Sequence, residues 1–174
     1  MRDRFVAGNT QSASQGSHRG IIIPLRMSFD SHVVRLRMHS SFDMLDVVQL
    51  VSDRLSAIAG FDEDATHWVG VAVRESVINA IKHGNHEAAD KFVMVEFAFT
   101  PREAPEELSI SVRDQGEGFD PEEVADPLAP ENMLKSSGRG IFFMRSFMDD
   151  VSLARHPEGG MEVRMVKKLA AAPS

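Results

Sequence analysis

The sequence contains no cysteine, and this absence excludes disulfide bonds and zinc sites built from thiolates. No apolar run approaches the roughly 20 residues of a membrane-spanning helix, and the N-terminus lacks the apolar core of a signal peptide. Basic residues are outnumbered, and the net charge of −7 argues against a general nucleic-acid binder, which needs a basic face. These absences favour a cytoplasmic protein that contacts neither nucleic acid nor membrane directly.

The composition is that of a folded protein: the chain has 174 residues, of which 43% are hydrophobic and 26% charged. This length suits one domain with a sizeable core. Residues 1–20 are rich in Ser, Gln, Gly and Asn without periodicity, which predicts a flexible tail. We therefore expect a domain at residues 21–169, preceded by that tail and followed by a short one at residues 170–174.

Hydrophobic periodicity predicts an α+β fold. Strands are expected at residues 33–38, 91–100, 108–113, 151–154 and 161–168, with a further short one near 21–25, and helices at residues 42–59, 63–83 and 138–147. Gly60 and Asp62 are suited to end the first helix and cap the second. The expected architecture is a two-layer sandwich, in which three helices cover one face of a mixed, mostly antiparallel sheet. Residues 120–137 carry three prolines and predict a long lid loop.

The stretch at residues 66–86, THWVGVAVRESVINAIKHGNH, is the most informative. On a helix its valines, isoleucines and alanines cover most of the circumference. The narrow polar sector that remains holds Glu75, Asn79, Lys82 and His83. This pattern predicts a mostly buried helix that presents a carboxylate and an amide one turn apart. Such a carboxylate suits a general base and the amide oxygen suits magnesium, although the polar residues of a core helix can also simply touch solvent.

Two glycine-rich patterns follow. In DQGEGFDP, Asp114 ends a predicted strand, and Gly116 and Gly118 before Phe119 would let a flat ligand approach the backbone. Taken alone, this pattern is also compatible with an ordinary strand-ending turn.

The second pattern, SSGRGI, opens the last predicted helix. Its free backbone N–H groups and the helix dipole would form an anion site, to which Arg139 adds a cation. Taken alone, it is also compatible with a glycine-rich connection between lid and helix.

The joint occurrence of these patterns in this order is far more specific. Here the chain resembles the Bergerat-fold (GHKL) ATPases, and among them the anti-sigma-factor serine kinases of bacteria, over roughly residues 31–168. The run GRGIFFMRSFMDDV carries this resemblance most strongly.

The resemblance implies ATP and Mg²⁺ as cofactors and a role for each motif. Glu75 would be the general base and Asn79 the Mg²⁺ ligand, Asp114 would accept a hydrogen bond from adenine, and residues 120–137 would be the ATP lid. The implied cofactor-binding set is Lys82, His83, Asp114, Gly116, Gly118, Phe119, Ser137, Gly138, Arg139, Gly140 and Ile141. His83 is also suited to a purely structural place near the negative end of the helix dipole.

The resemblance also implies partners: a STAS-type anti-anti-sigma protein as phosphoacceptor, a sigma factor, and a second copy of the chain in a homodimer. An ATP-gated binding module without phosphoryl transfer is the alternative, and the catalytic domain of a sensor histidine kinase is a third. The family often has threonine after the glycine of the last hairpin, whereas here Met161 follows Gly160. Trp68 and the pair Phe142 and Phe143 are expected in the core.

Overall fold

The computed structural model describes residues 32–100, 105–118 and 136–170. The predicted tail at residues 1–20, the short strand near 21–25, the lid up to residue 135 and Phe119 lie outside these ranges. The domain boundaries therefore remain a prediction.

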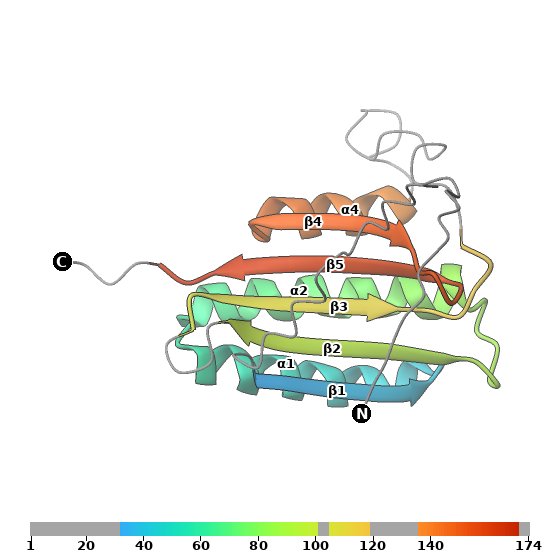
Figure 1. Ribbon diagram of the computed structural model, residues 1–174, viewed down its shortest axis with the longest axis horizontal. Coiled ribbons are helices and arrows are strands. Elements are labelled where there is room, and N and C mark those ends of the chain that lie inside the picture. The colour runs from blue at the N-terminus through green and yellow to red at the C-terminus, as the bar shows by residue number, and fades with distance from the viewer. Residues whose placement is uncertain (1–31, 101–104, 119–135, 171–174) are drawn as a thin grey trace, which may run out of the picture.

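A five-stranded sheet with the order β1-β2-β3-β5-β4 forms one layer (Figure 1). Every pairing is antiparallel, so the parallel component expected of a mixed sheet is not found in the described residues. The strands are β1 (His32–His39), β2 (Phe92–Thr100), β3 (Glu107–Arg113), β4 (Asp150–Arg155) and β5 (Met161–Lys168).

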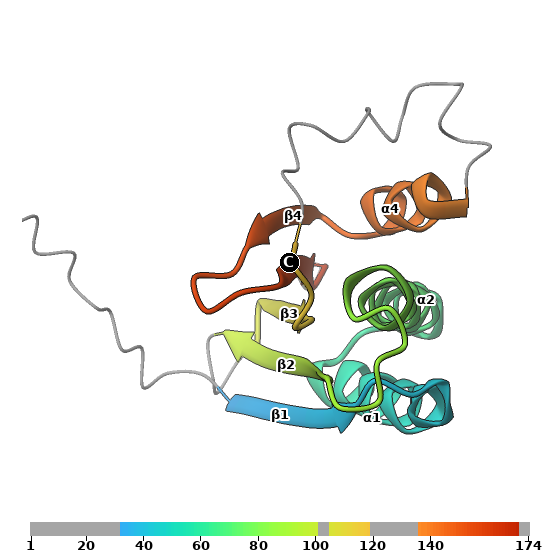
Figure 2. The same ribbon diagram turned by 90° about the vertical axis from the view of Figure 1, so that its right-hand side faces the viewer.

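Three helices form the second layer, and Figure 2 shows all of them on the same face of the sheet. The α+β sandwich predicted from the sequence is thereby confirmed. The helical elements are a short 3-10 helix η1 (Phe42–Met44), α1 (Leu45–Ala59), α2 (Glu63–Asn79), a π-helical turn η2 (Ala80–Gly84) that extends α2, and α4 (Ser136–Phe147). Helix α4 begins two residues before the predicted start, so Ser136 and Ser137 belong to it rather than to the lid.

The predicted helix ends are confirmed. The carboxylate of Asp62 accepts a hydrogen bond of 2.7 Å from the N–H of Ala65, which satisfies one free donor of the first turn of α2. Gly60 adopts a φ of 97° at the end of α1, a conformation that favours glycine. Local signals therefore fix where α1 stops and α2 starts.

The core lies between the sheet and one face of α2. Strands β2 and β3 alternate between buried and half-buried residues, and the buried face of β2 meets Val69, Val73 and Val77, each 0% exposed. Each such side chain stabilises the fold by about 1.5–3 kcal/mol. This packing fixes the rotation of α2, so that its polar sector faces away from the sheet.

The expectation that Trp68 lies in the core is wrong. Trp68 is half-buried and stacks on Phe147 of α4, with ring centroids 3.6 Å apart and planes at 6°. The reason is that α4 covers the polar sector of α2 rather than its apolar face.

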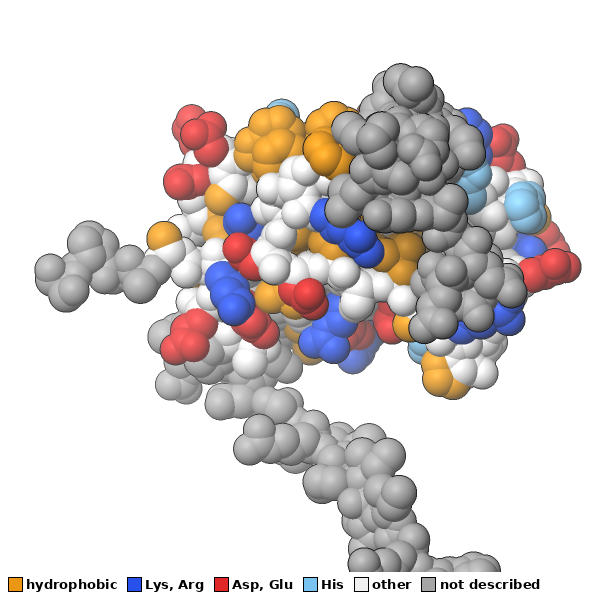
Figure 3. Space-filling view, turned by 90° about the horizontal axis from the view of Figure 1, so that it is seen from above, with side chains coloured by type: hydrophobic (Ala, Val, Ile, Leu, Met, Phe, Trp, Pro, Cys, Tyr) orange, Lys and Arg blue, Asp and Glu red, His pale blue; other side chains and the backbone are white. Residues whose placement is uncertain are grey.

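Phe142 and Phe143 are likewise half-buried, and neither belongs to the core cluster. Phe143 lies parallel to Phe147 at 6.3 Å. Seen from the side of β4 and α4, hydrophobic side chains reach the surface (Figure 3).

Among the described residues, no helix is long and apolar enough to cross a membrane.

The stack between Trp68 and Phe147 is expected to hold α4 against α2. A double-mutant cycle with Trp68→Leu and Phe147→Leu, measured by urea unfolding, should give a coupling free energy of about 0.5–1.5 kcal/mol. The pair Trp68 and Phe142, between which no ring contact is found, serves as the control and should show no coupling. Equal coupling in both pairs would contradict a specific stack.

Candidate functional site

Glu75 and Asn79 lie one turn apart on α2 and face the start of α4. Both are half-buried, and within the described residues neither side chain makes a hydrogen bond. A Cβ atom placed on Gly140 would lie 3.0 Å from the Nδ2 of Asn79 and 3.1 Å from the Oε2 of Glu75. Helix α4 can approach these two side chains this closely because residue 140 is glycine.

The described residues contain no group of three or more His, Cys, Asp or Glu side chains that could hold a metal ion. A metal at Asn79 therefore meets no such cluster in this part of the chain, and water and a bound ligand are suited to complete its coordination. Mg²⁺ commonly binds in this way, with one or two protein ligands, several waters and substrate phosphates. The donor set at Asn79 therefore fits a magnesium ion carried by a phosphate ligand.

Asp114 forms a second centre at the end of β3. It is 5% exposed, and its Oδ1 accepts hydrogen bonds from the N–H of Gly116 at 2.8 Å and of Met161 at 3.1 Å. No donor among the described residues reaches its Oδ2. A carboxylate oxygen that no described donor reaches keeps its capacity to accept a hydrogen bond, so this atom is suited to receive a donor from a ligand.

Three glycines surround this carboxylate, and we call them together with Asp114 the glycine cradle. A Cβ atom at Gly84 would lie 2.3 Å from the Oδ2 of Asp114, and one at Gly160 would lie 2.0 Å from its backbone oxygen. A Cβ atom at Gly116 would lie 2.1 Å from the backbone oxygen of Gly84. Because each of these contacts is too short for a side chain, the cradle brings the end of α2, the end of β3 and the β4–β5 turn together on bare backbone.

Gly118 extends the cradle toward the β4–β5 hairpin. Its φ is +69°, and its backbone oxygen accepts a hydrogen bond of 3.3 Å from Arg155 of β4. The pattern DQGEG is therefore part of a convergence of three segments, and not only a tight turn.

Asn85 is a positioning residue that the sequence analysis missed. It is 0% exposed, donates to the backbone oxygen of Phe92 at 3.0 Å and accepts from the N–H of Gln115 at 2.8 Å. The side chain of Gln115 in turn accepts from the N–H of Phe92 at 2.8 Å. The only signal in the sequence is an asparagine directly after the helix-ending Gly84. Its partners lie on other elements, Phe92 at the start of β2 and Gln115 30 residues along the chain.

Lys82 and His83 lie exposed on the π-helical turn that follows Asn79, and neither makes a hydrogen bond within the described residues. Burial lowers the pKa of His83, and the positive charges of Lys82 and His86 lower it further. The imidazole of His83 is thus biased toward its neutral form.

The remaining predicted site residues lie at the start of α4. Ser137, Gly138 and Arg139 belong to the first turn of this helix, where backbone N–H groups lack helical partners. Ile141 packs against the hydrophobic core, so only its backbone can contribute to an anion site. Phe119 is outside the described residues.

Comparisons with known proteins show to which family the chain is similar. The model of the family described as "Histidine kinase-like ATPase domain" matches residues 41–167. The chain is 28% identical over 140 residues to the "Serine-protein kinase RsbW" of Staphylococcus epidermidis, covering 77% of this chain and 85% of that protein. It is 36% identical over 106 residues to an "Anti-sigma F factor" of Bacillus velezensis, covering 59% of this chain and 68% of that protein.

Among solved structures, the chain is similar to the crystal structure of the RsbU and RsbW domains of a Mycobacterium tuberculosis protein. The TM-score is 0.55 at 16% identity, and the match covers 79% of this chain. The match covers 32% of that longer chain. This likeness supports the fold alone.

Replacing Asn85 by alanine is expected to lower the free energy of unfolding by about 1–3 kcal/mol, because it removes both hydrogen bonds of a fully buried side chain. Urea unfolding measures the loss. Asn79→Ala is the matched control, since Asn79 has no hydrogen bond to lose within the described residues, and it should change stability little. Equal losses in both variants would show that the bonds of Asn85 do not hold the cradle together.

Proposed function

Because the chain belongs to the histidine kinase-like ATPase family, and within it to the anti-sigma-factor serine kinases, we propose that it is an ATP- and Mg²⁺-dependent serine/threonine protein kinase acting as an anti-sigma factor. One observation carries the proposal. Glu75 and Asn79 lie against Gly140 and make no side-chain hydrogen bond within the described residues. At the far end of the same helix, the Oδ2 of Asp114 lies in the glycine cradle, where no donor from the described part of the chain reaches it.

The cradle is the proposed purine end of the site. The free Oδ2 of Asp114 would accept the hydrogen bond of an adenine amino group, and a guanine oxygen at the same place would be repelled. Gly118 would let a flat base approach the backbone, and Gly116 would support the site by letting Gly84 pack against the end of β3. The Oδ1 of Asp114 is held by backbone donors, one of them from Met161, so the carboxylate is oriented without the threonine that the family often has.

The start of α4 is the proposed phosphate end. Backbone N–H groups of Gly138, Arg139 and Gly140, next to Ser137 and Ile141, would bind phosphate oxygens at the helix N-terminus. Asn79 would hold Mg²⁺, whose charge would neutralise the phosphates during transfer. Lys82 follows on the next turn and would add positive charge, and His83 beside it would do so once bound phosphate favours its imidazolium.

Glu75 is the proposed general base. It would take the proton from a partner hydroxyl, whose oxygen forms a bond to the γ-phosphorus of ATP while the bond to the β,γ-bridging oxygen breaks and ADP leaves. The carboxylate of Glu75 is half-buried and makes no hydrogen bond within the described residues, which suits it to accept this proton.

The partners are proposed from the same family membership. They are a STAS-type anti-anti-sigma protein as phosphoacceptor, a sigma factor that is sequestered, and a second copy of the chain in a homodimer. Regulation of transcription through a sigma factor places the proposed activity in the cytoplasm.

The kinase proposal predicts that Glu75→Gln lowers the rate of phosphate transfer from labelled ATP to a STAS-type acceptor protein by about 100-fold or more. Asn79→Ala should remove the Mg²⁺ dependence of ATP binding in calorimetry. Glu63→Gln, an exposed carboxylate at the start of α2, is the control and should leave both unchanged. Undiminished phosphate transfer in Glu75→Gln would refute the role of Glu75 as general base. ATP-dependent binding of the partner without any phosphate transfer would indicate a binding module.

His83 provides a test of the phosphate end by pH. Its pKa is lowered in the free protein, so its NMR titration should fall below that of an ordinary histidine. Bound phosphate favours the imidazolium, and the pKa should therefore rise when ATP binds. His32 at the far edge of the sheet is the control resonance. A titration of His83 that ATP does not move would place His83 outside the nucleotide site.

A further inference from the structure

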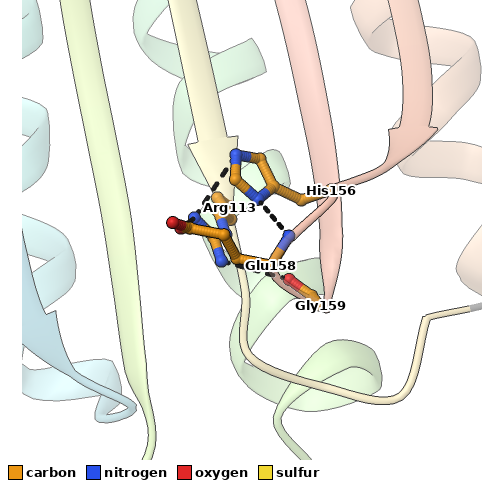
Figure 4. A network of polar contacts seen from close by, with 4 residues as sticks. All are labelled: Arg113, His156, Glu158 and Gly159. Carbon is orange, nitrogen blue, oxygen red and sulfur yellow. Dashed lines mark hydrogen bonds and ion pairs between the residues drawn. The ribbon is translucent and has the colours of Figure 1, made fainter.

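Arg113, the last residue of β3, reaches across to the turn between β4 and β5 (Figure 4). Its guanidinium donates to the carboxylate of Glu158 at 2.8 Å and to the backbone oxygen of Gly159 at 3.3 Å. The same group lies 3.3 Å from the Nε2 of His156. One side chain thus contacts three residues of a single turn.

The two ends of this interaction differ in burial. The side chain of Arg113 is 16% exposed and that of Glu158 is 77% exposed. The hydrogen bond from Arg113 and its positive charge lower the pKa of Glu158, so the carboxylate stays ionised in the pair. An exposed ion pair is worth little by itself, but here the arginine belongs to β3 and its side chain is mostly buried, so it offers the turn a fixed attachment point.

The contact with His156 depends on the tautomer. The Nδ1 of His156 accepts a hydrogen bond of 3.2 Å from the N–H of Glu158. A neutral imidazole has one acceptor nitrogen, so with Nδ1 accepting, Nε2 carries the proton and cannot accept from Arg113. The bonds to Glu158 and Gly159 are therefore the ones by which Arg113 holds the turn.

The turn that Arg113 holds continues directly into the glycine cradle. Gly160 follows Gly159 and lies against the backbone oxygen of Asp114. Met161 donates its N–H to the Oδ1 of Asp114 at 3.1 Å and accepts from the N–H of Asp114 at 3.0 Å. The orientation of the Asp114 carboxylate thus depends on where the turn is held.

We infer that Arg113 is a positioning residue for the purine end of the site, which acts through the β4–β5 turn on the carboxylate of Asp114. This inference rests on the proposed function, because it takes Asp114 as the group that binds the base. Arg113 lies on the sheet face opposite to the helices, so it touches neither the phosphates nor Glu75.

The inference predicts a specific signature in binding. Loss of the hydrogen bonds from Arg113 to Glu158 and Gly159 should weaken the binding of ATP and of ADP by the same factor, because both nucleotides contain adenine. Loss of a group at the phosphate end would affect the two nucleotides differently. The rate of phosphate transfer at saturating ATP should be unchanged, since Glu75 and Asn79 lie on α2 and keep their places.

The experiment compares Arg113→Gln with Arg164→Gln by calorimetry with ATP and ADP and by transfer kinetics. Arg164 lies on the same sheet face in β5, is exposed and makes no hydrogen bond within the described residues, which makes it a matched control. Arg113→Gln should weaken both nucleotides about tenfold, as expected for losing a charged hydrogen bond. Arg113→Lys should recover part of this loss, and Arg164→Gln should bind like the wild type.

Two outcomes would overturn the inference. One is a lower melting temperature with unchanged nucleotide dissociation constants, which is the behaviour of a merely structural residue. The other is a loss of transfer rate at saturating ATP with unchanged binding. Glu158→Gln is a second variant in case the arginine variant misfolds, because it changes only the exposed partner of Arg113. It should also weaken the binding of both ATP and ADP.

A second readout separates this inference from the proposed function. Amide exchange of the Met161 N–H, which is bonded to Asp114, can be followed by NMR without any nucleotide. This exchange should become faster in Arg113→Gln than in Arg164→Gln. Equal exchange rates would refute the inference that Arg113 holds the turn against Asp114. If the wild type binds no ATP at all, the proposed function fails, and this exchange rate alone decides whether Arg113 holds Asp114.

Discussion

The site depends on one constraint, the packing of the Asp114 carboxylate between bare backbone segments. Gly84, Gly116 and Gly160 bring the end of α2, the end of β3 and the β4–β5 turn into contact with this residue. Asn85 adds hydrogen bonds that join the first two of these segments to the start of β2. Because the Oδ2 of Asp114 lies against Gly84, the proposed purine end and the end of α2 form one structural unit.

Helix α2 connects this unit to the phosphate end. Its apolar face is packed against the sheet, and the opposite face carries Glu75 and Asn79 under Gly140. The same helix ends at Gly84, so the distance between the two ends of the site is set by a rigid element. Phosphoryl transfer depends mainly on positioning, and a core helix is a suitable frame for it.

Structural features that depend on neighbouring residues in the sequence could be predicted, and features that depend on contacts between different elements could not. Gly60 and Asp62 mark the helix ends through conformation and capping, and the alternation in β2 reveals its buried face. Asn85 is buried because it forms hydrogen bonds with Phe92 and Gln115, and the sequence around Asn85 does not predict these bonds. Trp68 was expected in the core from its hydrophobicity, but α4 covers it at the molecular edge. For the site, the polar sector and both glycine patterns were visible, whereas their convergence required the fold.

The position of Trp68 has a practical consequence. It is the only tryptophan of the chain, and its ring lies 3.6 Å from that of Phe147, at the opposite end of α4 from Gly140. The ultraviolet fluorescence of the protein therefore arises at a single place, on the helix that covers Glu75 and Asn79. A shift of that helix changes the surroundings of the indole, so the chain contains a built-in optical reporter of its own site, without any label.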